Sequence, residues 1–309
     1  MSHSVRSRRV AATLAVGTAL LSLCACGSGN SGSSATTTSV VSPPTPVGGT
    51  ALSGRFGELE GRFGARLGVF ALDTGSGHIV EYRADERFAF CSTFKALEAG
   101  AILTTAGPAE LDRRITYTAT DLTAYAPITR PHVTDGMTVR DLLDAAVRYS
   151  DNTAANLLFG LLGGPAGLQH DLRNLGDQVT RSDRLEPALS EATPGDPRDT
   201  STPRTFATDL RTYVLGTALP TDNRTLLTTM LRTNTTGAGL IRAGVPADWV
   251  VGDKTGNGDY GTRNDIAVLW PPHRAPIVLA VMSTRHGHDD TYDNALIAQA
   301  ANAAVTALK

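Results

Sequence analysis

The stretch GDKTGNGDYGTRNDIAVLW, residues 252–270, is compatible with two different structures, a dinucleotide-binding loop and a strand hairpin. Which of the two it forms decides the fold of this chain. Gly256, Gly258 and Gly261 have the G-x-G-x-x-G spacing of a dinucleotide-binding loop. Such a loop needs a helix directly after its glycines, since the helix N-terminus binds the phosphates. Here a β-branched apolar run follows instead and stops at two prolines. The stretch therefore predicts strand, glycine-rich turn and strand, with Lys254 at the edge of the hairpin.

The composition is that of a globular protein without a strong charge bias. The chain has 309 residues, 41% of them hydrophobic and 19% charged, and its formal net charge is −2. This length accommodates one large domain or two interleaved ones. A near-neutral charge without basic runs argues against nucleic acid as the main partner.

Residues 1–26 form a predicted export signal. Arg6, Arg8 and Arg9 precede the apolar run VAATLAVGTALLSLCA, which is too short to span a bilayer comfortably. The LCAC end of the run resembles a bacterial lipoprotein cleavage site, in which Cys26 becomes the lipidated first residue. Simple cleavage nearby is the alternative, and both Sec and twin-arginine export remain open. We expect an exported protein, either in the periplasm, lipid-anchored to the outer face of the cytoplasmic membrane, or secreted.

A flexible tether is predicted between this leader and the folded part. Residues 27–50 carry no charge and are rich in Gly, Ser, Thr and Pro, so they have little to bury. A random coil of this length spans on the order of 25–30 Å. Two of the three cysteines lie in the leader, which leaves Cys91 without a disulfide partner in the mature domain.

The folded part, residues 51–309, begins and ends with the same kinds of elements. An amphipathic helix leads into a strand hairpin, LGVFALD and HIVEYR. Helical spacing then extends from about residue 92 to residue 233. The chain returns to three strands, WVVGDK, DIAVLW and PIVLAVMS, and a final helix. The apolar face of the first helix consists of Leu52, Phe56, Leu59 and Phe63.

This order of elements predicts that the two ends of the chain share one sheet. The simplest assembly is a five-stranded antiparallel sheet with the terminal helices on one face. A helical domain is then inserted between the second and third strands. We predict an α/β lobe from residues 51–88 plus 235–309 and a helical lobe from residues 89–234, with the functional site in the cleft between them.

Three short motifs carry candidate chemistry, and each is weak alone. Ser92 and Lys95 lie at positions i and i+3 at the start of a helix, which puts both side chains on one face. A neighbouring base can make a serine nucleophilic, but S-x-x-K more often marks a helix cap and a solvated lysine. The second motif is Ser150, Asp151 and Asn152, three capping residue types before an apolar helix. The third is the K-T-G of the hairpin.

Taken together, S-x-x-K, S-D-N and K-T-G in this order resemble class A serine β-lactamases over residues 50 to 309. The resemblance implies the fold shared with penicillin-binding proteins, an α/β lobe with an all-α lobe. It implies hydrolysis of the β-lactam amide of penicillin- and cephalosporin-type antibiotics through a Ser92 acyl-enzyme, and hence antibiotic resistance. The loop TRSDRLEPALSEATPGDPRDTSTP resembles the family's Ω-loop, in which Glu186 activates the deacylating water. A surface glutamate beside a proline is the alternative for that residue.

The resemblance also implies roles in acyl transfer. Either Lys95, or Glu186 acting through a water, takes the proton of the Ser92 hydroxyl, and which one does so is disputed for this family. Ser150 relays a proton to the leaving nitrogen, with Lys254 nearby.

The substrate is expected to contact residues from all three motifs. The backbone N–H groups of Ser92 and Asn257 are implied to form the oxyanion hole. Asn152 matches the family's contact to the side-chain amide of the substrate. Thr255 and Arg263 match its grip on the substrate carboxylate.

Five further residues belong to the Ω-loop or to the mouth of the site. Asn156 falls where the family holds the glutamate, and Arg184 and Asp199 fall where an ion pair ties the neck of the loop. Tyr125 is expected as an aromatic wall at the mouth, with core packing as the alternative. Ser190 stands where the family has an asparagine that shares the hydrolytic water. A hydroxyl reaches less far, so we expect a more loosely held water and slower deacylation on some substrates.

No metal or cofactor is expected, and the predicted partners are small β-lactam molecules bound by a monomer. His286, His288 and Asp290 in HGHDD are similar to the zinc motif of metallo-β-lactamases. Thr291 stands where the final histidine of that motif would be, so a solvated loop is favoured.

Cys91 directly precedes the expected nucleophile. Some carbapenem-hydrolysing relatives bridge this position to a second cysteine, but the partner position is Gly258 here. We therefore expect a small buried residue behind the site.

Two other functions compete with β-lactam hydrolysis. A penicillin-binding D,D-peptidase shares the acylation machinery but lacks the hydrolytic glutamate, so Glu186 argues against it. A cell-wall-binding or sensor lipoprotein would be acylated and would remain so.

Overall fold

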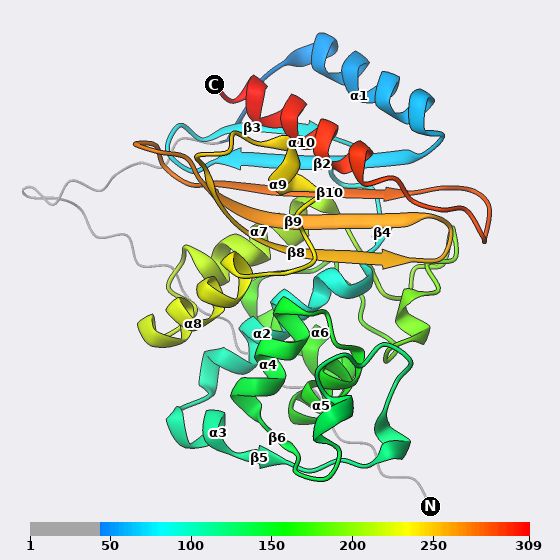
Figure 1. Ribbon diagram of the computed structural model, residues 1–309. Helices are drawn as coiled ribbons and strands as arrows, with labels where there is room; N and C mark the ends of the chain where they lie inside the picture. Colours follow the sequence, from blue (N-terminus) through cyan, green and yellow to red (C-terminus); the bar gives the residue numbers. More distant parts are fainter. Residues whose placement is uncertain (1–43) are drawn as a thin grey trace, which may run out of the picture. The chain divides into compact units, whose positions relative to one another are not determined.

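A mixed six-stranded sheet forms the centre of the fold, and the computed structural model describes residues 44–309. The predicted export signal, the anchor at Cys26 and the tether up to residue 43 lie outside the described residues. The strands follow the order β1-β3-β2-β10-β9-β8 (Figure 1). Their bounds are β1 (Thr45–Pro46), β2 (Arg66–Asp73), β3 (His78–Tyr82), β8 (Val250–Gly258), β9 (Thr262–Trp270) and β10 (Ile277–Thr284).

Five of these strands are the predicted ones, and each pairs antiparallel with its neighbours. The sixth, β1, adds two residues in parallel to the outer edge of β3, so the predicted number of five strands was wrong. The predicted tether also ends too late, because β1 and the start of α1 (Gly49–Phe63) fall inside residues 27–50. Thr45 and Pro46 are exposed, and a backbone pairing of this kind leaves no apolar pattern in the sequence.

Helices cover both faces of the sheet. α1 and α10 (Asn294–Ala307) lie together on one face, as predicted, while α7 (Pro203–Val214) and α8 (Thr221–Arg232) contact the other (Figure 1). Phe56 and Leu59 of α1 are buried, which confirms the predicted apolar face.

The sheet is buried on both faces, so its strands have nearly continuous apolar sequences. In β10, alternate side chains enter two separate hydrophobic clusters. Val278, Ala280 and Met282 belong to the cluster that includes the inserted helices. Ile277, Leu279 and Val281 belong to the cluster formed with α1 and α10.

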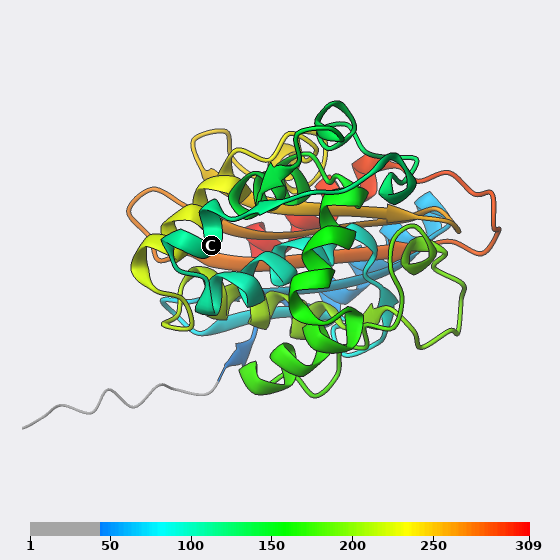
Figure 2. The same cartoon turned by 90° about the horizontal axis from the view of Figure 1, so that it is seen from below.

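The inserted segment is helical, as predicted, and crosses in front of the strands when seen from below (Figure 2). It shares one continuous core with the sheet, so the lobe boundaries at residues 89 and 234 stay a prediction. None of the helices within residues 44–309 has the length and apolar character to cross a membrane.

The helices not yet named are α2 (Phe94–Thr105), α3 (Pro108–Asp112), α4 (Val139–Arg148), α5 (Asn152–Leu162), α6 (Pro165–Leu175) and α9 (Ile241–Gly244). The short 3₁₀ turns are η1 (Cys91–Thr93), η2 (Ala119–Asp121), η3 (Arg130–His132) and η4 (Ala188–Ser190). Two small sheets pair β4 (Phe88–Ala89) with β7 (Thr200–Ser201) and β5 (Arg114–Ile115) with β6 (Met137–Thr138).

The stretch 252–270 forms the hairpin that the sequence predicts. β8 and β9 pair up to Gly258 and Thr262, and a tight turn connects them. Tyr260 and Gly261 both have φ near 55° in that turn, a left-handed conformation that glycine adopts easily. A strand follows the glycines, so this stretch is not a dinucleotide-binding loop.

Candidate active site

Ser92 lies in η1, directly before α2, where the inserted helices meet the edge strand β8. Its hydroxyl accepts a hydrogen bond from Nζ of Lys95 at 2.9 Å and donates one to Oε1 of Glu186 at 3.0 Å. Ser92 and Lys95 thus share one face of the helix, as their spacing predicts. The contact between Ser92 and Glu186 is direct, whereas the sequence suggested one through a water.

Lys95 is completely buried and is surrounded by oxygen atoms. Its Nζ donates to the carbonyl oxygen of Ser150 at 2.9 Å and to Oδ1 of Asn152 at 2.5 Å. It also forms an ion pair with Oε1 of Glu186 at 3.1 Å. The three hydrogen bonds, to Ser92, Ser150 and Asn152, use all three N–H donors of the ammonium group, and the contact with Glu186 is electrostatic.

Glu186 is buried and held by side chains on two elements. Its backbone N–H and carbonyl oxygen form a pair of 2.9 Å hydrogen bonds with the side-chain amide of Asn156 in α5. The hydroxyl of Ser190 in η4 donates to Oε2 across 3.0 Å. The carboxylate therefore has one oxygen facing Ser92 and Lys95 and the other facing Ser190.

Lys254 and Ser150 meet on the opposite side of the nucleophile. Nζ of Lys254 donates to Oγ of Ser150 at 3.0 Å and to the carbonyl oxygen of Thr255 at 2.8 Å. Burial and then the ammonium of Lys95 lower the pKa of Lys254 well below its usual value, although Asp253 opposes the shift. A lysine in this state can exchange a proton with a neighbouring hydroxyl.

The middle residue of the S-D-N motif has a structural role. Asp151 is fully buried, caps α5 by accepting from the backbone N–H of Ala154, and accepts from the backbone N–H groups of Ile128 and Thr129, all at 2.9 Å. The capping interpretation is therefore right for Asp151. Ser150, whose φ is 59°, belongs to the site instead.

A pocket of about 420 Å³ opens beside these groups. Eight of the predicted site residues line it. Lys95, Glu186 and Lys254 contact lining residues from behind, and Asn156 in turn contacts Glu186. Tyr125 is 52% exposed, so its core alternative is wrong. The eight predicted lining residues are Ser92, Tyr125, Ser150, Asn152, Ser190, Thr255, Asn257 and Arg263.

Three residues of the site were missed by the sequence analysis. Thr236 lines the pocket, and its hydroxyl lies 2.6 Å from that of Thr255. The ring of Tyr292 lies 4.5 Å below the guanidinium carbon of Arg263, and Asn294 accepts from Nε of the same arginine at 2.8 Å. Tyr292 and Asn294 come from the loop after β10 and the start of α10, and no motif marks them.

Gly256 brings β8 into close contact with the turn that carries Ser92. A Cβ on this glycine would lie 2.9 Å from the carbonyl oxygen of Phe90 and 3.2 Å from the backbone nitrogen of Ser92. Only a residue without a side chain permits this approach. The backbone N–H groups predicted to form the oxyanion hole belong to these two segments.

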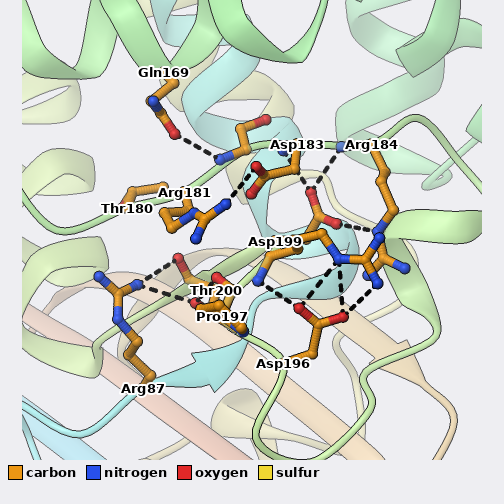
Figure 3. Close-up of polar contacts among 12 residues, drawn as sticks. Arg87, Gln169, Thr180, Arg181, Asp183, Arg184, Asp196, Pro197, Asp199 and Thr200 are labelled. Carbon is orange, nitrogen blue, oxygen red and sulfur yellow. Dashed lines mark hydrogen bonds and ion pairs between the residues drawn. The ribbon is translucent and has the colours of Figure 1, made fainter.

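The neck of the Ω-loop is tied by an ion pair, as predicted. Nε of Arg184 lies 2.5 Å from Oδ2 of the buried Asp199. Figure 3 shows Asp199 also accepting from the backbone N–H groups of Asp183 and Arg184, at 2.8 and 3.0 Å. Glu191 provides a second carboxylate for Arg184.

Cys91 and Gly258 face each other, as predicted. A Cβ at Gly258 would lie 2.8 Å from Sγ of Cys91, and Cys91 is a free, buried thiol. Burial raises the pKa of Cys91 above its usual value, so the thiol is inert.

The HGHDD segment forms an exposed loop. Nδ1 of His288 lies 2.8 Å from Oδ1 of Asp289, and Asp290 accepts from the backbone N–H of Gly287 at 2.8 Å. Within residues 44–309, no three His, Cys, Asp or Glu side chains are grouped so as to hold a metal ion.

Comparison with known proteins agrees with this geometry. The profile of the Beta-lactamase enzyme family matches residues 51–308. A β-lactamase of Amycolatopsis lactamdurans is 59% identical over 266 residues, which are 86% of this chain and 87% of that relative. β-Lactamase AST-1 of Nocardia asteroides is 51% identical over 308 residues, covering 98% and 96% of the two chains.

The solved structures lead to the same family. The crystal structure of a class A β-lactamase from Clostridium kluyveri superposes with a TM-score of 0.82 at 47% identity. That match covers 83% of this chain and 98% of the other.

Proposed function

This chain belongs to the class A β-lactamases, and from that premise we propose how its own residues divide the reaction between them. Proteins of this family are serine hydrolases that open the β-lactam amide, and this hydrolysis confers antibiotic resistance. The assignment of each step to a residue below is our proposal.

Ser92 is the nucleophile, and its oxygen attacks the lactam carbonyl carbon to form an acyl-enzyme. Glu186 takes the hydroxyl proton, and Lys95 stabilises the developing negative charge. Two contacts support this division: Ser92 donates to Glu186, while Lys95 donates to Ser92. Lys95 also donates to Ser150 and Asn152, so its N–H donors are engaged and Glu186 is the acceptor that faces the Ser92 hydroxyl.

Ser150 supplies the proton that the lactam nitrogen needs when its bond to the carbonyl carbon breaks. Lys254 replaces that proton through the 3.0 Å contact between Nζ and the Ser150 hydroxyl. Because the pKa of Lys254 is lowered, its ammonium group gives up a proton to the Ser150 oxygen more readily than an ordinary lysine would.

The carbonyl oxygen becomes negative as the tetrahedral intermediate forms. We assign the backbone N–H groups of Ser92 and Asn257 to bind it, because β8 and η1 meet at Gly256. Removing one donor of such a pair costs roughly 3–4 kcal/mol of transition-state stabilisation in comparable enzymes.

Hydrolysis of the ester completes the cycle. Before this step Glu186 releases the proton it took from Ser92, and Lys254 regains the one it gave up, so both groups return to their starting states. Glu186 then takes a proton from a water molecule, and the resulting hydroxide attacks the acyl carbon. The bond to the Ser92 oxygen breaks, and Glu186 passes its proton to that oxygen. Ser190 and Asn156 hold Glu186 for this step.

The opposite end of the pocket holds the substrate. Arg263 and Thr255 bind its carboxylate, and Asn152 contacts its side-chain amide. Tyr125 and Tyr292 form aromatic walls at the mouth. The positive charge of Arg263 and the exposed ring of Tyr125 support this orientation.

The observation that carries the proposal is the contact of one hydroxyl, Ser92 Oγ, with both Lys95 and Glu186. Turnover of a chromogenic cephalosporin and mass spectrometry of the treated protein test it. Glu186→Gln should lose turnover. Ser92 should be acylated more slowly, because Lys95 is the only remaining base in contact with its hydroxyl, and the adduct should then persist because no carboxylate activates the hydrolytic water. Unchanged turnover would refute Glu186 as the base, and permanent acylation of the wild type would favour a D,D-peptidase or a sensor.

We also propose that the protein is exported and acts as a monomer, with a lipid anchor at Cys26. The arginine-led apolar leader and its LCAC end support this. Labelling with a radioactive fatty acid in cells should mark the wild type but not Cys26→Ser. Equal labelling of both would exclude Cys26 as the anchor, and size-exclusion chromatography with light scattering tests the monomer.

A further inference from the structure

A second cavity, which we call the arginine cavity, lies behind the Ω-loop. It measures about 490 Å³, and its walls come from β2, the segment Glu86–Ala89, the Ω-loop residues 192–198 and the segment Thr284–His286. It shares no lining residue with the active-site pocket. Its volume is typical of sites that hold small molecules.

Four arginines and one histidine line the cavity, against two carboxylates. Arg66 pairs with Glu86 at 2.7 Å, and Arg198 pairs with Asp196 at 2.6 Å. The two carboxylates are therefore already engaged, and two guanidinium groups remain. The chain as a whole carries a net charge of −2, so this excess of positive charge is local.

The other two arginines have no carboxylate partner within residues 44–309. Arg87 donates to the carbonyl oxygen of Val179 at 2.7 Å. It also donates to the hydroxyl of Thr200 at 3.0 Å (Figure 3). The guanidinium of Arg285 has no hydrogen bond or ion pair with any described residue, and this side chain is half-buried. Guanidinium groups bind carboxylates and phosphates through paired N–H donors.

The rest of the lining is largely apolar. Phe88, Ala89, Ala192, Pro194 and Pro197 contribute side chains without polar atoms. The ring of Phe88 is fixed under the guanidinium of Arg66, 3.9 Å from its centroid. Such walls favour an anion that carries an apolar body over a bare inorganic ion.

We propose that the arginine cavity is a binding site for a small organic anion, separate from the catalytic pocket. Arg285 and Arg87 bind the anionic group, and Phe88 with the Ω-loop prolines packs against the apolar body. Because the arginine cavity shares no lining residue with the catalytic pocket, this proposal does not rest on the roles assigned to the catalytic residues.

Isothermal titration calorimetry of the full enzyme with phenylphosphate tests the proposal at low salt, where charged contacts are least screened. We expect binding that weakens about tenfold in Arg285→Gln, the loss typical of one charged contact. Arg55→Gln is the matched control, because Arg55 is an exposed arginine outside the cavity, and it should bind like the wild type.

A further variant separates the two pockets of the protein. If Arg263→Gln abolishes binding while Arg285→Gln does not, the anion occupies the active site and the proposal is overturned. Undetectable binding to the wild type overturns it as well. Inorganic phosphate is the second probe, and an affinity equal to that of phenylphosphate would overturn the assignment to an organic anion. If Arg285→Gln alters thermal unfolding, the phenylphosphate affinity of Arg87→Gln is compared with that of the wild type instead. The same tenfold weakening is then expected, and an unchanged affinity would overturn the proposal.

Discussion

The hydroxyl of Ser190 donates a hydrogen bond to Oε2 of Glu186 across 3.0 Å. Ser190 is the position at which the family resemblance predicts an asparagine. The short side chain binds the carboxylate itself, and this leaves it poorly placed to share a water molecule held farther out. The departure therefore bears on deacylation more than on acylation.

We predict that Ser190→Asn accelerates deacylation, by about 3- to 10-fold on at least one class of β-lactam, because the amide reaches farther and adds a donor for the water. Rapid-quench measurement of acyl-enzyme decay with a penicillin, a cephalosporin and a carbapenem checks this. Ser190→Ala is the control and should slow decay, since Oε2 loses the hydroxyl. If Ser190→Asn does not deacylate faster with any of the three substrates, Ser190 does not limit deacylation.

A pH-dependent stability is predicted for Glu98, which lies one turn beyond Lys95 in α2. Both carboxyl oxygens are buried and have no hydrogen-bond partner within residues 44–309, and burial raises the pKa of Glu98 well above its ordinary 4.5. The folded state therefore holds this proton more tightly than the unfolded chain. The resulting stabilisation is complete below the unfolded pKa and is lost as the pH rises through the folded one.

Glu98→Gln removes this titration while keeping the shape of the side chain. We expect it to stabilise the protein by about 1–2 kcal/mol at pH 8, roughly 2–6 °C in Tm, and by much less at pH 4.5. Calorimetric melting curves at both pH values measure the difference. Glu58→Gln, an exposed glutamate, should show no such trend. A gain that is equal at both pH values would contradict a titrating Glu98.

The grouping of the candidate site residues could be predicted because these residues lie in contiguous motifs. Ser92 and Lys95 share a helix face by spacing alone, and their motif order identifies Ser150 and Lys254. Glu186 is recognisable from the length and composition of its loop. Local geometry and a known order of motifs suffice for such residues.

Other parts of the site depend on tertiary packing and have no local signal. Tyr292 reaches Arg263 only because the loop after β10 folds back over the start of β9. Thr236 meets Thr255 because the loop before α9 packs on β8. β1 could not be predicted either, since an exposed two-residue strand requires no apolar residue.

The stacking of Tyr292 on Arg263 predicts a specific kinetic defect. Tyr292→Leu should raise KM about 3- to 10-fold with little change in kcat, because a less rigid guanidinium binds the substrate carboxylate less well. Tyr292→Phe keeps the ring and should behave like the wild type. In an Arg263→Gln background, Tyr292→Leu should raise KM by a smaller factor, because the guanidinium that the ring orders is gone and only its contact as a pocket wall is lost. A fall in kcat at constant KM would contradict a role in carboxylate binding.

The close approach of β8 to η1 predicts that Gly256→Ala slows acylation. The new Cβ would lie 2.9 Å from the carbonyl oxygen of Phe90 and 3.1 Å from the backbone nitrogen of Thr93, and backbone atoms cannot move aside as a flexible side chain can. The strand must shift, which separates the two proposed oxyanion donors. We expect an acylation rate about 100-fold lower, as for the loss of one donor.

Stopped-flow acylation with a chromogenic cephalosporin measures this rate. Gly54→Ala in α1 is the control, since nothing lies within 4 Å of its Cβ and alanine favours a helix, so acylation should be unchanged. Circular dichroism should show Gly256→Ala still folded, because the shift is confined to one edge strand. If folded Gly256→Ala acylates at the wild-type rate, the contact between β8 and η1 does not position the oxyanion hole.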